Sequence, residues 1–217
     1  MMTLEEKKMR LVEKEWECFQ QVQNEGGRAS CQDDRTTFFI MRKSQFVLWP
    51  ENLIDSYTID VDNAVFMGRN LLAEKYAWMM ADTAPAKFEE LKELLTMPTE
   101  KAQEAIDYIV PVQVKWMEEY AAKYPYIAAG NRVVHTSEER FGQTSYETYL
   151  RGELHTYSEK TLLLLADLCR RLDAEGTNMM LAIMTATMQE YGFADLDAAE
   201  ATTKKYAVAG KISADEL

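Results

Sequence analysis

Residues 30–49 read SCQDDRTTFFIMRKSQFVLW, and this stretch decides how the rest of the chain is interpreted. As a helix with about 100° per residue, it would place charged, amide and aromatic side chains on one face: Arg35, Phe38, Phe39, Arg42, Gln45, Phe46 and Trp49. The opposite face is also largely apolar, and a helix that is apolar nearly all round is normally buried. Because burying an unpaired charge costs several kcal/mol, we expect the two arginines to meet either acidic side chains of other helices or an anionic ligand.

The remainder of the chain also reads as helices. Thr3 and Glu6 form a capping-box pattern, which opens a first helix that should run to about Asn24 and stop at Gly26–Gly27. Ser30 is expected to cap the second helix. We further predict one long helix over 51–80, a helix over 99–123 kinked by Pro111, and shorter helices over 85–95, 145–155, 159–174, 177–192 and 196–206.

These patterns predict an all-α fold, a single-domain bundle of about seven to nine helices over residues 1–206. Residues 207–217 are expected to form a flexible C-terminal tail. The segment from Tyr124 to Gln143 shows no sustained period, and it contains the one strand-like run, Arg132 to His135. Long loops of this kind often serve as lids or binding segments.

Composition argues against several classes of partner. The formal net charge is −12, from 36 acidic and 24 basic residues, and such a surface repels nucleic acid and anionic membranes, although a local basic pocket would escape this rule. No segment approaches the length of a membrane span, and the three widely spaced cysteines follow no metal-binding pattern. We therefore expect a cytoplasmic protein; no metal site is indicated, and the cofactor and the oligomeric state stay open.

Three blocks are distinctive as sequences. They are GGRASCQDDRTTFFIMRKSQFVLW at 26–49, SYTIDVDNA at 56–64 and GRNLLAEKYAWMM at 68–80. Together they resemble a family of bacterial proteins, the domain of unknown function numbered 4125, with the densest likeness over residues 12–84. The resemblance implies a bacterial cytoplasmic helical protein and carries no activity with it.

Candidate functional residues are the polar groups on faces that should be dry. Glu15 lies on the apolar stripe of the first helix, and Asp60 and Lys75 lie on one face of the 51–80 helix, about 22 Å apart if that helix is unbroken. Burial would raise the pKa values of the carboxylates and lower that of Lys75, so these three are the candidates for catalysis. The candidates for binding a small anionic ligand are Arg28, Gln32, Arg35, Arg42, Gln45 and Tyr57.

Two interpretations follow from these residues. In the first, a pocket between helices one to three binds or transforms a small anionic metabolite. In the second, the same groups form a closed polar network inside a non-catalytic helical interaction or scaffold protein. A ligand-sized cavity with unpaired polar groups would favour the first, and direct pairing of every such group without a cavity would favour the second.

Overall fold

The computed structural model describes residues 2–23, 27–140 and 142–209. Regular structure in these ranges consists of eleven α-helices and three 3-10 turns, which confirms the all-α class and exceeds the predicted seven to nine helices. The helices are α1 Leu4–Gln20, α2 Arg35–Gln45, α3 Glu51–Phe66, α4 Leu71–Thr83, α5 Pro85–Leu91, α6 Glu100–Lys123, α7 Pro125–Ala128, α8 Tyr146–Leu154, α9 Glu159–Ala174, α10 Met179–Glu190 and α11 Leu196–Val208.

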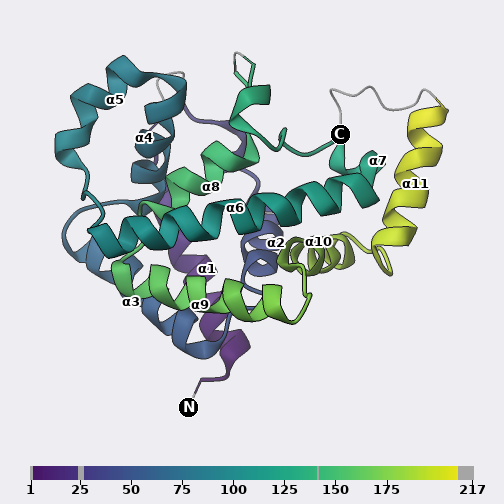
Figure 1. Cartoon of the computed structure of the whole chain (residues 1–217), viewed down its shortest axis with the longest axis horizontal. Coiled ribbons are helices and arrows are strands. Elements are labelled where there is room, and N and C mark those ends of the chain that lie inside the picture. Colours follow the sequence, from purple (N-terminus) through teal and green to yellow (C-terminus); the bar gives the residue numbers. More distant parts are fainter. Residues whose placement is uncertain (1, 24–26, 141, 210–217) are drawn as a thin grey trace.

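Helix α6 runs across the middle of the molecule in the view of Figure 1. It contacts α7, α8, α9 and α10, and its buried side is lined by large apolar residues such as Ile106, Ile109 and Tyr120. Thr99 caps it as predicted: its hydroxyl accepts from the Ala102 amide at 3.2 Å and donates to the Glu159 carboxylate of α9. Pro111 lies inside a continuous helix, and the kink expected there stays a prediction.

The prediction of one helix over 51–80 is wrong, because the chain turns between α3 and α4. Gly68 has a φ of +72°, a left-handed conformation that glycine adopts readily after a helix end. The side chain of Asn70 then caps α4 by accepting from the Leu72 amide at 3.0 Å, and its own amide donates to the Cys18 carbonyl at 2.7 Å. The turn therefore folds α4 back against α1 and α8.

The second helix also differs from the prediction. Ser30–Gln32 forms a separate 3-10 turn, and Asp34, rather than Ser30, caps α2 by accepting from the Thr37 amide at 2.9 Å. The helix ends at Gln45 instead of reaching Trp49. It is not buried all round: Met41 is 48% exposed, because α2 packs on α1 and α10 along one side.

The remaining predictions concern helix caps, the strand-like run and segments that lie outside the described residues. Thr3, Ser145 and Ser158 cap α1, α8 and α9 as predicted, whereas Asn178 takes the role expected of Thr177. The strand-like run at 132–135 is not a strand. The first helix was predicted to run to about Asn24, which is wrong, because α1 ends at Gln20 and residues 22–23 are not helical. Residues 24–26 and the tail from 210 to 217 lie outside the described residues, so most of the predicted tail stays a prediction.

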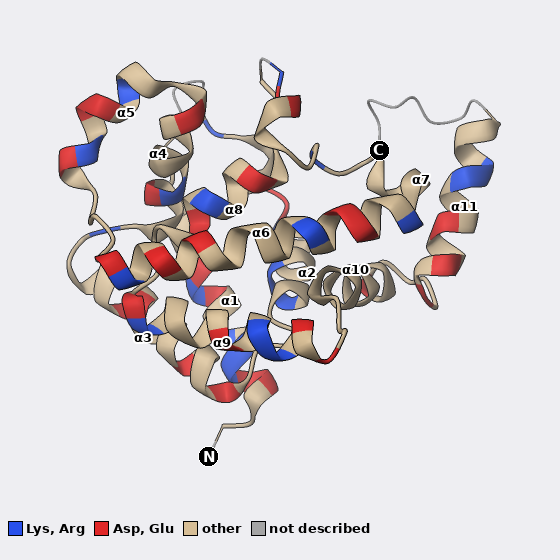
Figure 2. Cartoon of the chain, in the orientation of Figure 1, with Lys and Arg blue, Asp and Glu red and all other residues tan. Residues whose placement is uncertain are grey.

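Acidic and basic residues are interspersed along α5, α6 and α11 (Figure 2). Within the described ranges, no helix is both long and apolar enough to cross a membrane.

Candidate functional site

Five helices bring their polar side chains together in the interior, and we call this group the central polar network. It comprises Glu15 of α1, Arg42 and Gln45 of α2, Tyr57 of α3, Lys75 of α4, Tyr149 and Glu153 of α8, and Tyr157, which follows α8. The turn at Gly68 is what allows Lys75 to approach α8, because a straight helix would have carried it away from the other groups.

Arg42 is the centre of the network. Its side chain is 11% exposed, and its Nε donates to Glu15 at 2.9 Å while a terminal nitrogen donates to the other Glu15 oxygen. The second terminal nitrogen donates to Gln45 at 2.6 Å and to Glu153 at 2.9 Å. This forked binding of a carboxylate is the strongest geometry available to an arginine. The positive charge of Arg42, which was expected to need a counter-charge, therefore has two, Glu15 and Glu153.

Glu15 is fully buried. Besides the guanidinium of Arg42, its carboxylate accepts a hydrogen bond from the Tyr57 hydroxyl at 2.8 Å. Burial, together with the negative charge of Glu15, raises the pKa of Tyr57 well above its ordinary value. Tyr57 therefore stays protonated and acts as a hydrogen-bond donor.

Glu153 joins the network from the opposite side. One carboxylate oxygen accepts from Arg42, from the Tyr157 hydroxyl at 2.8 Å and from Gln45 at 3.3 Å. Burial alone would raise the pKa of Glu153, but the charges of Arg42 and Lys75 lower it to about 2. The carboxylate is therefore ionised across the whole neutral range.

Lys75 closes the network near α8. Its ammonium donates to the Tyr149 hydroxyl at 2.5 Å, lies 3.8 Å from Glu153 and sits 4.1 Å from the centre of the Tyr149 ring. Burial acts to lower the pKa of Lys75, but Tyr149 and Glu153 outweigh it and the pKa is raised. The expectation that burial would lower this pKa is wrong, because the group is paired where it is buried.

The chemistry of the network follows from these charges. Arg42 and Lys75 carry two positive charges, and Glu15 and Glu153 carry two negative ones, so the group is neutral. An efficient general acid or base has a pKa near the working pH, whereas the pKa of Glu153 is about 2 and that of Lys75 is raised. The geometry thus suits a structural network better than proton transfer.

The other predicted ligand-binding residues lie outside the network. Arg28 has a side chain that is 46% exposed and donates to Asp33 at 2.8 Å. Gln32 is buried, and its amide donates to the carbonyls of Phe19 and Val22, both at 2.9 Å, which ties the 3-10 turn to the end of α1. Neither residue contributes to the central polar network, and their role in ligand binding stays a prediction.

Arg35 and Asp60 also have local partners. Arg35 is exposed, and its guanidinium lies 4.0 Å from the ring centre of Phe39, so the expectation that both arginines are buried is wrong. Asp60 accepts from the Ser158 amide at 3.1 Å and from the Thr161 hydroxyl at 2.6 Å. It thus binds the first turn of α9 and does not reach Arg42.

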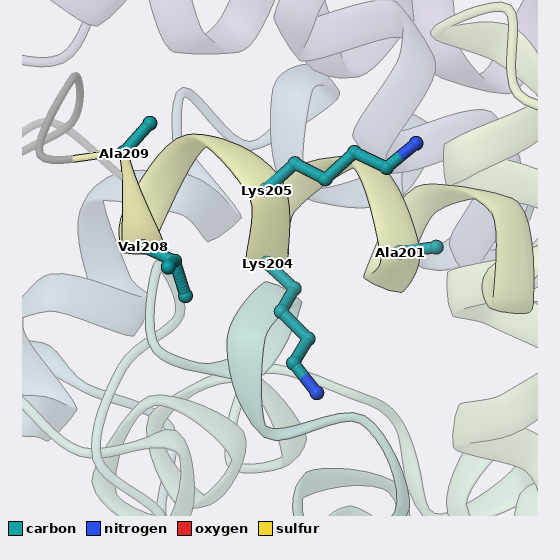
Figure 3. A pocket seen from close by; sticks show the side chains of 5 residues that line it. All are labelled: Ala201, Lys204, Lys205, Val208 and Ala209. Carbon is teal, nitrogen blue, oxygen red and sulfur yellow. The ribbon is translucent and has the colours of Figure 1, made fainter.

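Two hollows in the described part of the chain are lined by residues outside the central polar network. One, of about 530 Å³, is an open depression along α11 (Figure 3), lined by Ala201, Lys204, Lys205, Val208 and Ala209. Its two lysines extend to different sides of the helix. The other measures about 90 Å³ and lies between α1, α2 and α10. Across the described ranges, no group of three or more His, Cys, Asp or Glu is placed to hold a metal ion.

Sequence reasoning missed the contribution of α8 to the network. Glu153 was not among the predicted site residues, although its charged partners come from α2 and α4. A usable signal was present, because Tyr149, Glu153 and Tyr157 recur every four residues and so share one helix face. That pattern marks a polar, aromatic stripe, but nothing local indicates that it faces Arg42.

Comparison with known proteins gives one match. The family model described as "Protein of unknown function (DUF4125)" matches residues 6–201, which confirms the resemblance and extends it far beyond residues 12–84. The matched region includes every residue of the central polar network. Neither the curated proteins nor the solved structures gave a match.

Proposed function

We propose that this chain, which belongs to the DUF4125 family, is a non-catalytic helical interaction protein. In this role, the central polar network holds the helices in one arrangement. The observation that carries this proposal is the complete pairing of the network. Each of its four charged groups has an oppositely charged or hydroxyl partner inside it, and the hollows along α11 and between α1, α2 and α10 are lined by other residues.

The pocket hypothesis is weaker on the same evidence. A metabolite at Arg42 would have to displace Glu15 and Glu153, which are among the least exposed carboxylates of the chain. Leaving either one buried without its partner costs several kcal/mol, so a ligand would need unusually strong contacts of its own. A closed network does not carry this cost.

The surface for a partner lies at the turn between α3 and α4, and we call it the α3 knob. It consists of Val65, Phe66 and Met67, which are 55%, 90% and 67% exposed, together with Ile59, which is 51% exposed and lies seven residues before Phe66 on the same side of α3. Large aromatic anchors of this kind dominate binding energy at interfaces, and Phe66 makes almost no contact within its own chain.

We assign this knob to a basic protein partner. The chain carries a net charge of −12, which opposes close approach of a second copy and favours a partner of opposite charge. The exposed carboxylate of Asp62, beside the knob on α3 and bound to Lys14, is where a basic rim would lie. The partner should therefore combine an apolar groove for Phe66 with Lys or Arg around it.

Photo-crosslinking tests this assignment. The photoreactive amino acid benzoylphenylalanine replaces Phe66 in the full chain, and a matched control places it at Leu94, another apolar residue that is 77% exposed but lies outside the knob. We expect a covalent adduct with another protein from position 66 only. Once purified, that protein should have a basic isoelectric point and should bind wild type but not Phe66→Asp. Adducts with a second copy of the chain, equal adducts from both positions, or no adduct would each refute it.

A ligand screen by thermal shift separates the two functions. If the network is structural, carboxylates, phosphates and amino acids will stabilise wild type and Arg42→Met equally or not at all. A metabolite that stabilises wild type and has no effect on Arg42→Met would instead support the pocket.

A further inference from the structure

A second group of charged side chains, separate from the central polar network and from the α3 knob, surrounds a hollow of about 90 Å³. We call it the α1–α2–α10 hollow. Its lining comes from Glu5 and Lys8 of α1, Lys43 and Ser44 of α2, Val47 after α2, and Ala186 and Glu190 of α10.

Lys8 is a buried cation with a weakly held counter-ion. It is only 5% exposed, and its ammonium donates to the Val47 carbonyl at 3.3 Å, just beyond the end of α2, where the helix dipole favours positive charge. Its carboxylate partner, Glu5 at 2.9 Å, has a side chain that is 68% exposed. Solvent screens such a pair, so Glu5 can turn outward at little cost while Lys8 stays in place.

Ser44 supplies a second observation. It is 2% exposed and lines the hollow, yet its hydroxyl is one of only two buried side-chain polar groups in the described residues without a hydrogen-bond partner. A buried hydroxyl in this state is unfavourable, and an acceptor that enters the hollow relieves it. The other lysine of the hollow, Lys43, is held by Glu190, and both side chains are about 40% exposed.

We propose that the α1–α2–α10 hollow binds a phosphate-type oxyanion. The fixed groups are donors, namely the Lys8 ammonium and the Ser44 hydroxyl, whereas the carboxylates at the rim are exposed and can move away. A volume of 90 Å³ corresponds to about three water molecules at ~30 Å³ each, which suits one tetrahedral anion. The overall charge of −12 repels anions at long range, so binding depends on these local donors.

Calorimetric titration with inorganic phosphate, at ionic strength held constant with chloride, tests the site. We expect saturable binding of one phosphate by wild type. Lys8→Met and Ser44→Ala should each raise the dissociation constant about tenfold or more, which is the usual loss for a hydrogen bond to a charged group.

Lys7→Met is the matched control. It removes the same charge from the neighbouring position of α1, but the Lys7 ammonium binds Glu51 and Asp55, away from the hollow, so its dissociation constant should equal that of wild type. Ser44→Ala removes a hydroxyl that has no partner, so it decides the matter should Lys8→Met fail to fold. The proposal is overturned when wild type shows no saturable binding, or when both lysine variants weaken binding equally.

A parallel titration with glycerol 3-phosphate identifies the source of the anion. Equal or tighter binding with the same dependence on Lys8 and Ser44 supports a phosphoryl group carried by a larger molecule. Binding of inorganic phosphate alone supports a free anion.

Discussion

Replacement of Arg42 by methionine is the most direct test of the central polar network. Methionine keeps an unbranched apolar stem beside Phe46, whose ring centre lies 5.1 Å from the guanidinium, and removes the charge and its donors. Glu15 and Glu153, with side chains 0% and 7% exposed, would then remain buried without the cation between them. The substitution therefore isolates the electrostatic role of Arg42 from its packing.

The expected loss is large. Removing one partner of a buried ion pair costs about 3–5 kcal/mol, and in a protein of this size each kcal/mol lowers the melting temperature by about 2–4 °C. We therefore expect Arg42→Met to melt roughly 6–20 °C below wild type. Urea unfolding at pH 7, followed by circular dichroism, gives the free energy of unfolding directly.

Arg35→Met is the matched control, because Arg35 lies on the same helix and also packs on a phenylalanine four residues later, at 4.0 Å. An exposed contact of this kind contributes only about 0.5–1 kcal/mol. Loss of no more stability in Arg42→Met than in Arg35→Met would refute the argument that the network is buried and tightly paired.

The pH dependence of Arg42→Met gives an independent check. Without the guanidinium, burial and mutual repulsion should raise the folded-state pKa values of the two carboxylates above their unfolded values. The folded variant then binds more protons than the unfolded chain, so its deficit relative to wild type should shrink as the pH falls from 7 to about 5. A deficit that does not change with pH would show that the two carboxylates are not the groups left unpaired.

Three further outcomes are expected. The pKa of Glu153 is lowered to about 2, so wild type should lose stability on the order of 3 kcal/mol as the pH falls from about 4.5 to 2. Glu153→Gln lacks this carboxylate and should not show that loss. If the free energies of unfolding in urea of the two proteins fell in parallel with pH, this prediction would be contradicted. Gly152→Ala places a Cβ 2.6 Å from Met79 Cγ, and calorimetry should show a loss of about 1–3 kcal/mol from overpacking instead of the usual gain for alanine in a helix. Asp60→Ala should cost about 1 kcal/mol in urea unfolding by releasing the Ser158 amide, as lost caps do, whereas Asp60→Asn, which keeps an acceptor, should cost less.

Local patterns predicted the fold well where a single residue decides the conformation. Thr3 and Thr99 cap helices because a hydroxyl can satisfy free amides at any helix start, and this needs no knowledge of the rest of the chain. The same kind of signal was missed at the end of α3, where Gly68 was placed inside the predicted helix over 51–80 instead of being recognised as a helix stop. An asparagine two residues later, Asn70, is a cap signal, and the two together predict the turn that the structure contains.

The site could be predicted only in part, because contacts between distant helices leave no local trace. Arg42 was expected to meet acidic side chains of other helices or an anionic ligand, and Glu15 was singled out, since each lies among apolar residues and carries a charge that burial would otherwise leave unpaired. The partner of Arg42 on α8 is 111 residues away in the chain, and no periodicity reveals which helices are neighbours. For the same reason, Asp60 was assigned to the site although its partners are the first residues of α9.

The comparison of Lys8 with Arg42 explains why the central polar network is closed to a ligand, whereas the α1–α2–α10 hollow is open to one. Both cations are largely buried, but the carboxylates that hold Arg42 are buried with it, whereas Glu5, which holds Lys8, lies in solvent. Displacing a buried carboxylate costs several kcal/mol, and displacing an exposed one costs at most about 1 kcal/mol. An anion can therefore enter beside Lys8 without opening the core, so phosphate should stabilise wild type and Arg42→Met to the same degree. A response to phosphate that depended on Arg42 would place the anion in the central polar network instead.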